Sequence, residues 1–225
     1  MQDEISDHVR YFLKSQVLRL VSFCCIVVAV TFLASCEWET LGASIAEQTG
    51  DGGLLSEDTC SAPCFWGITP GETTKEQVVE ILEQKNGSYI CETNTRLNIL
   101  SCRNSLSIGF DRTDYVKAVC IYLSSAISVE EVIEKYGAPY AVEVICDDIV
   151  PDRTIFDMRL FYDEIYAAIS LQRQETWPDY DVERETLVSY VCYFDENTYF
   201  DTLASNKYLT EWIGYGSYSE PENGE

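Results

Sequence analysis

Cysteine side chains offer the clearest chemistry in this chain. It has ten cysteines, seven of which follow residue 36. In an oxidising compartment these seven thiols are expected to form disulfides, and an odd number leaves at least one unpaired. The pairing cannot be read from the spacing. Cys120, in a strand-like apolar run, is the candidate for the unpaired thiol, and the candidates for disulfides are Cys60, Cys64, Cys91, Cys102, Cys146 and Cys192.

The segment that begins at Cys60 concentrates unusual residues. Three residues separate Cys60 from Cys64, whereas a thioredoxin-type redox pair has two, so the spacing argues against redox catalysis. Phe65 and Trp66 follow directly. They either contact a partner or fill the core behind a loop that the disulfide fixes, and the second interpretation is the simpler one. Trp212, in a later aromatic stretch, is a third possible partner contact.

Histidine is nearly missing, since His8 is the only one. Beyond residue 36 the chain therefore has no Ser-His-Asp or Cys-His catalysis and no histidine-bound zinc. Paired carboxylates, a lysine base or calcium remain possible, and we expect no cofactor. Weak calcium candidates are Asp179, Asp181 and Glu183, but an EF-hand loop needs glycine where Arg184 stands. A solvated acidic loop is the simpler interpretation.

The first 36 residues have the organisation of a targeting segment. Basic residues precede an apolar stretch over 20–34, which is the length of a signal-peptide core and short of a membrane span. The ending Leu33-Ala34-Ser35-Cys36 resembles the lipobox of bacterial lipoproteins. The resemblance implies a signal peptide over 1–35, lipidation of Cys36, a flexible tether to residue 59 and a location on the extracytoplasmic face of a bacterial cell envelope. An uncleaved anchor helix is the alternative.

Negative charge dominates the exported part. The net charge is −23, and the acidic and basic residues of the first 35 positions cancel. Such a surface repels phosphate backbones, so we expect no nucleic-acid partner. It serves solubility or attracts cationic partners.

Two segments offset by 54 residues predict short helices. Thr74 and Ser128 are each followed three residues later by Gln77 or Glu131, the arrangement of a capping box. Apolar residues then recur at helical spacing until a glycine in each segment.

Strand-like sequence follows each helix. The pattern predicts an α+β fold of two tandem helix-plus-antiparallel-β-meander repeats, with short helices packed on the sheet. The expected repeats are 60–126 and 127–216, the second with a C-terminal extension that contains a helix over 198–206. Residues 217–225 are expected to form a disordered acidic tail.

Two further resemblances bear on function. A helix, Tyr136-Gly137-Ala138-Pro139 and a meander resemble the β-lactamase-inhibitor-like fold, shared by small outer-membrane-assembly lipoproteins, which bind proteins rather than catalyse. The segment CSAPCFWGITPGETT over 60–74 is similar to lipoproteins of Chloroflexi-type bacteria and implies no known activity.

These observations predict a lipid-anchored, non-catalytic binding or scaffold module. Its expected partners are the membrane, through the lipid, and an envelope protein. The alternatives are a carboxylate-dependent, glycan-cleaving envelope hydrolase and a calcium-dependent adhesion module.

Overall fold

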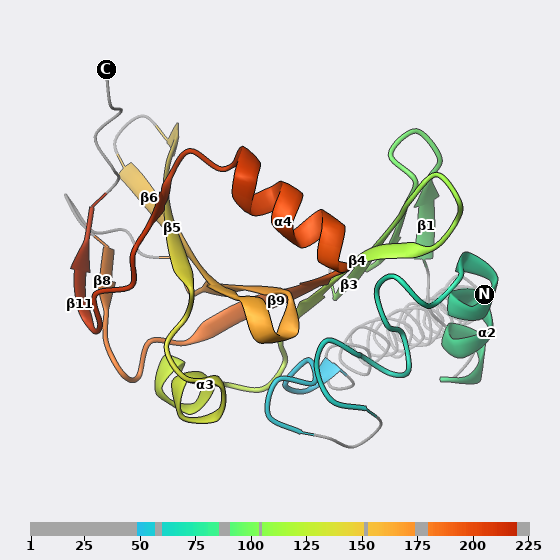
Figure 1. Ribbon diagram of the computed structural model, residues 1–225, viewed down its shortest axis with the longest axis horizontal. Helices are drawn as coiled ribbons and strands as arrows, with labels where there is room; N and C mark the ends of the chain where they lie inside the picture. The colour runs from blue at the N-terminus through green and yellow to red at the C-terminus, as the bar shows by residue number, and fades with distance from the viewer. Residues whose placement is uncertain are drawn as a thin grey trace, which may run out of the picture. The chain divides into compact units, whose positions relative to one another are not determined.

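The computed structural model describes residues 49–56, 60–85, 91–103, 105–150, 153–173 and 180–219, with backbone alone over 146–150 and 153–156. These residues belong to one compact unit, Ile45–Glu225 (Figure 1). The predicted signal peptide, Cys36, most of the tether and Asp179 lie outside the described residues. Among the helices described, none is long and apolar enough to cross a membrane.

The fold is mixed α+β and mostly β. A nine-stranded antiparallel sheet has the strand order β1-β2-β3-β4-β9-β7-β6-β5-β10, and β8 pairs with β11 in a separate ribbon. The strands of the large sheet are β1 (Cys91–Asn94), β2 (Ile99–Cys102), β3 (Leu106–Phe110), β4 (Val116–Tyr122), β5 (Ala141–Val150), β6 (Arg153–Tyr162), β7 (Ala167–Leu171), β9 (Val188–Phe194) and β10 (Leu209–Thr210). The ribbon consists of β8 (Tyr180–Val182) and β11 (Gly216–Tyr218).

The helices of the described part begin at well-capped residues. In α2 (Lys75–Gln84) and α3 (Val129–Tyr136) the predicted capping boxes are confirmed, at Thr74 and Ser128 respectively. Gly137 ends α3 with φ of 77°, a conformation that glycine adopts without strain. The expected C-terminal helix is α4 (Glu196–Ser205), which Asp195 caps by accepting a hydrogen bond from the Thr198 N–H. A single 3-10 turn, η1 (Asp163–Ile165), joins β6 to β7.

Each of α2 and α3 is tied at its start to the last strand of a meander. Thr74 forms a β-bridge with Tyr115, next to β4, and Ser128 forms one with Leu187, next to β9. The cap residue of each helix therefore fixes the helix against a strand that follows it in sequence.

The two meanders meet where β4 pairs with β9. Cys120 and Cys192 lie directly opposite each other at the centre of this pairing, and a disulfide joins them. The prediction that Cys120 is unpaired is wrong, because its partner comes from a strand 72 residues away that the sequence does not identify as a neighbour. A second disulfide, Cys91–Cys102, links β1 to β2.

The two faces of the sheet differ. Alternate residues of β4 and β9, such as Ile121 and Tyr193, are fully buried in the main core together with Val78 of α2 and Val132 of α3. On the other face α4 places Tyr199 against Ala141, Phe161 and Ala168 of β5, β6 and β7. Figure 1 accordingly shows α3 and α4 on opposite sides of β9.

Two predicted boundaries need correction. The tether was expected to reach residue 59, but Leu54 is fully buried in the core and the Tyr193 hydroxyl donates to the Gly52 carbonyl oxygen at 3.1 Å. The tail was expected to begin at Ser217, but Gly216–Tyr218 is β11 and Tyr218 is buried. The described residues of the two segments, 49–56 and 217–219, are held by contacts with residues distant in sequence.

Candidate functional site

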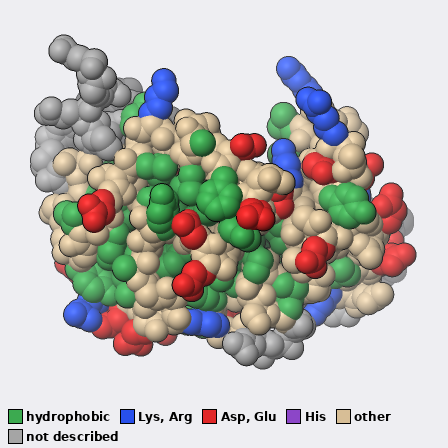
Figure 2. Space-filling model, viewed as in Figure 1, with side chains coloured by type: hydrophobic (Ala, Val, Ile, Leu, Met, Phe, Trp, Pro, Cys, Tyr) green, Lys and Arg blue, Asp and Glu red, His purple; other side chains and the backbone are tan. Residues whose placement is uncertain are grey.

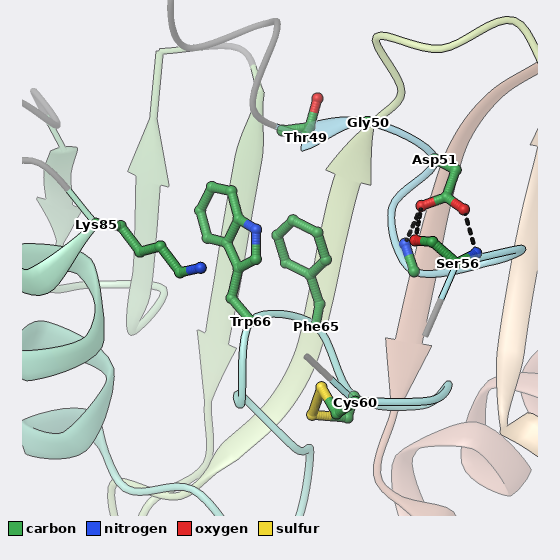
Figure 3. Close-up of a pocket in the computed structure, with 10 residues that line it drawn as sticks. Thr49, Gly50, Asp51, Ser56, Cys60, Phe65, Trp66 and Lys85 are labelled. Atoms are coloured by element: carbon green, nitrogen blue, oxygen red, sulfur yellow. Dashed lines mark hydrogen bonds between the residues drawn. A yellow bond between two sulfur atoms is a disulfide. The ribbon is translucent and has the colours of Figure 1, made fainter. Parts of the chain in front are cut away.

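A pocket of about 210 Å³ lies beside the Cys60–Cys64 disulfide (Figure 3). Phe65 and Trp66 form one part of its lining, and Asp51 and Lys85 supply its acidic and basic side chains. Three segments of the chain thus meet here: the turn at 49–56, the disulfide loop with the aromatic pair that follows it, and the end of α2.

The aromatic pair is held by a tight turn. Phe65 and Ile68 exchange two backbone hydrogen bonds of 3.1 and 2.8 Å, which leaves Trp66 and Gly67 as the two turn residues. Both have positive φ, 55° and 86°, as the turns of two-residue hairpins require. The Phe65 and Trp66 rings stack with centroids 4.4 Å apart.

This turn separates the roles of the two rings. Phe65 is only 4% exposed and belongs to the core, which is the simpler of the two interpretations that the sequence allowed. Trp66 is half-buried, and its ring faces the Lys85 Nζ at 5.6 Å. Figure 3 shows Lys85 extending toward Trp66 from α2. Both rings line the pocket, and Trp66 is the more exposed of the two.

Asp51 organises the opposite rim of the pocket. Its carboxylate accepts hydrogen bonds from the Gly53 and Leu55 N–H groups, both at 2.9 Å, and from the Ser56 N–H and hydroxyl. Partial burial raises the pKa of Asp51, but the donors of Ser56, Gly53 and Leu55 together outweigh it and hold the pKa below its usual value. The carboxylate is therefore a structural group rather than a proton acceptor.

Replacing Asp51 with asparagine is expected to lower the free energy of unfolding at pH 7 by about 1 kcal/mol, because the partly exposed carboxylate is screened by water. The lowered pKa means that this contribution is present at neutral pH and is lost as pH falls below about 4. Thermal unfolding at pH 7 and pH 3 measures it. Asp201→Asn, at an exposed position of α4, is the control, and an unchanged difference at both pH values would contradict the assignment.

The disulfide at this site has an additional contact. Cys60 and Cys64 have Cα atoms 5.6 Å apart, and the Gly67 N–H donates to the Cys60 Sγ at 3.4 Å. Cys60 is half-buried, whereas Cys64 is largely buried. The two sulfurs of this bond therefore lie in unequal surroundings.

The other predicted site residues that the structure describes do not line this pocket. Trp212 stacks on Tyr218 with ring centroids 5.6 Å apart and covers the β8–β11 ribbon. Asp181, an exposed residue of β8, accepts a hydrogen bond from the Ser217 hydroxyl across the ribbon. Glu183 follows β8 and is exposed. No cluster of potential metal ligands occurs among the described residues.

A second cleft, of about 630 Å³, contains acidic residues from the turn before α2, the β3–β4 turn and the start of α4. Glu72, Asp111, Asp195 and Glu196 are among its lining. Asp111 caps the β3–β4 turn through the Thr113 and Tyr115 N–H groups, and Asp195 caps α4. Two of these carboxylates thus have structural roles. Figure 2 shows acidic side chains scattered over the visible face rather than gathered in one patch.

Sequence reasoning did not find Asp51 or Lys85. The signal for Asp51 is the tripeptide Asp51-Gly52-Gly53, since aspartate before glycine is typical of a turn closed by the carboxylate. Lys85 carries no such signal, because only the packing of α2 places it beside Trp66.

No protein-family model, curated protein or solved structure matches this chain.

Proposed function

We propose that this chain is a lipid-anchored extracytoplasmic protein that acts as a non-catalytic binding or scaffold module for an envelope partner. The observation that carries the location is that every cysteine whose side chain is described forms a disulfide. Structural disulfides are typical of exported proteins. The lipobox-like sequence at Leu33–Cys36 supplies the anchor.

We further propose that the domain is a tandem repeat, α2 with β1–β4 and α3 with β5, β6, β7 and β9. Support comes from hydrogen bonds that recur in both halves. In the first half the Val116 N–H donates to Thr73 O at 2.9 Å, and in the second half the Val188 N–H donates to Ile127 O at 2.8 Å. The acceptors at the helix starts, Thr73 and Ile127, are 54 positions apart in sequence, whereas the strand residues Val116 and Val188 are 72 positions apart. The second half is longer because it contains β8 and the loops around it.

The pairing of β4 with β9 supports a two-fold relation centred on the Cys120–Cys192 bond. With the strand offset of 72 residues, Cys120 corresponds to Cys192, and these two equivalent residues pair directly with each other and share a disulfide. A repeat that joins through its last strands makes one continuous sheet from two halves.

The part of this sheet that favours binding is the face of β2–β4 on the side of α4. Tyr122 is 53% exposed there, Ser101 is exposed and Ser107 is half-buried. In the second half of the sheet, α4 covers the corresponding face. An exposed, disulfide-linked sheet face with a tyrosine at the end of β4 suits protein recognition.

A carboxylate-dependent hydrolase is the second candidate, favoured by the acidic cleft. Glycan cleavage by a carboxylate pair needs one acid and one base or nucleophile at a defined separation. Because Asp111 and Asp195 are engaged as caps, that pair would be Glu72 and Glu196, which makes the binding function the better supported one.

Expression of the full chain in a bacterial host tests the proposal. Lipidation predicts an intact mass that lacks residues 1–35 and gains acyl chains, and Cys36→Ser should abolish both changes and release the protein from membranes.

Crosslinking in intact cells should then capture an envelope protein with the lipidated chain. Tyr122→Ala should weaken that capture, whereas Tyr140→Ala, at an exposed tyrosine beyond this face, should not. An uncleaved leader would contradict the anchor, and turnover in a glycan-hydrolysis screen that Glu72→Gln abolishes would contradict the binding function.

A further inference from the structure

We propose that the Cys60–Cys64 disulfide is an exchange site for thiols, at which Cys60 forms a mixed disulfide with a dithiol partner, Cys64 leaves as a thiolate, and the second thiol of the partner resolves the mixed disulfide. The inference goes beyond the proposed binding function and does not depend on it. It departs from the expectation drawn from the spacing of Cys60 and Cys64, because that spacing excludes only the two-residue arrangement of thioredoxin-type pairs. It rests on the position of this bond, its polar surroundings and the way its loop is held.

The position of this disulfide differs from that of the other two. Cys91–Cys102 and Cys120–Cys192 each join directly opposed residues of paired strands, so the disulfide and the strand pairing stabilise each other. Cys60–Cys64 closes a separation of only four residues, compared with 11 and 72. A bond that closes so short a loop constrains the unfolded chain least. It contributes least to stability and lines a pocket that a reagent can enter.

The surroundings of the bond favour negative charge on Cys60. The Gly67 N–H already donates to its Sγ at 3.4 Å, and a thiolate accepts such a bond more strongly than a disulfide sulfur does. Lys85 adds a positive charge to the same pocket. The negative charge of Asp51 is directed at the Ser56, Gly53 and Leu55 donors. Reactive cysteines occur in partly exposed surroundings where a donor or a positive charge favours the thiolate, and Cys60 has the Gly67 N–H as a donor and shares its pocket with Lys85.

The loop keeps the two cysteines together without the bond. The Cys64 N–H donates to Ser61 O at 3.0 Å, and the Phe65–Ile68 turn is closed by its own pair of hydrogen bonds. Phe65 is anchored in the core. Reduction therefore leaves the backbone in place, and the bond can form again.

The exchange balances as follows. A thiolate of the partner attacks the Cys60 Sγ, the Cys60–Cys64 bond breaks, and Cys64 leaves as a thiolate that takes up a proton. The second thiolate of the partner then attacks its own sulfur in the mixed disulfide and releases Cys60 as a thiolate next to the Gly67 N–H. Two electrons pass to the cysteine pair, and the partner dithiol becomes a disulfide.

Timed reduction of the oxidised full chain with dithiothreitol tests this inference. Acid quenching, alkylation of free thiols and peptide mass spectrometry follow each disulfide separately. We expect Cys60 and Cys64 to become alkylated at least about tenfold faster than the other paired cysteines. Equal rates, or loss of all three disulfides together, would overturn the proposal.

Two variants identify the reacting sulfur. With Cys64→Ser, incubation with oxidised glutathione should place a mixed disulfide on Cys60. Glutathionylation of Cys64 in Cys60→Ser should be slower by about tenfold, since Cys64 is more buried and lacks the Gly67 contact. Preferential labelling of Cys64 would contradict the assigned order.

A second pair of variants tests the charge of Lys85. Lys85→Gln should slow the reaction at Cys60 by about threefold at low salt, and Lys117→Gln, outside the pocket, should not.

Discussion

Replacing Cys120 and Cys192 together with alanine is expected to lower the free energy of unfolding by about 4 kcal/mol, the largest loss from any disulfide of the described domain. The bond closes a loop of 72 residues, and in the chain-entropy treatment its removal returns that freedom to the unfolded chain. The sulfurs also join the strands at which the two halves of the sheet meet. Denaturant unfolding of the domain from residue 36 onward, monitored by circular dichroism, measures the loss.

The matched control is the double replacement of Cys91 and Cys102 with alanine. Their disulfide closes a separation of 11 residues at the edge of the sheet. The same treatment gives a loss of about 3 kcal/mol for that pair. If the edge pair were the more costly of the two, the central pairing of β4 with β9 would not be the main constraint on this fold.

Tyr199→Ala is expected to cost about 3–5 kcal/mol and to release α4 from the sheet. Tyr199 is fully buried against Phe161 and Ala168, and its hydroxyl donates to the Asp163 Oδ1 at 2.6 Å. Burial, together with the same hydrogen bond, raises the pKa of Tyr199 well above its ordinary value, so the hydroxyl stays a donor throughout the neutral range. Hydrogen exchange of α4, together with denaturant unfolding, measures both parts of the effect.

Two neighbouring substitutions separate the contributions. Tyr199→Phe keeps the ring and removes the donor, for an expected loss of about 1 kcal/mol. Phe200→Ala removes a ring of similar size from the exposed side of the same helix and should cost less than Tyr199→Ala. A loss from Phe200→Ala equal to that from Tyr199→Ala would show that α4 is held by its outer face instead.

Local sequence was sufficient for the helices. Thr74 with Gln77 and Ser128 with Glu131 satisfy the first free N–H groups of each helix, and such bonds depend only on residues three positions apart. The α4 segment was predicted two residues late, because its cap is Asp195 rather than a residue nearer the apolar pattern. The mostly antiparallel α+β class followed from the same local patterns.

Of the candidate site, the sequence identified the residues of the Cys60–Trp66 segment but not their roles. Phe65 and Trp66 are adjacent and chemically alike, and a turn with positive φ at Trp66 sends one ring into the core and leaves the other half-exposed. The sequence places Asp51 in a tether because the burial of Leu54 beside it depends on the distant sheet, which local sequence does not reveal. The hydrogen bonds of Asp51 itself are local.

The sequence by itself determined the positions of helices and turns, the acidity of the domain, the lack of histidine chemistry after residue 36 and the presence of cysteines suited to disulfides. Only the tertiary structure decided that Cys120 pairs with Cys192, that β4 lies beside β9 and that Lys85 meets Trp66. The physical reason is range. Caps, turns and periodic patterns are set by neighbours along the chain, whereas strand order is set by the burial of apolar faces that residues far apart in sequence share.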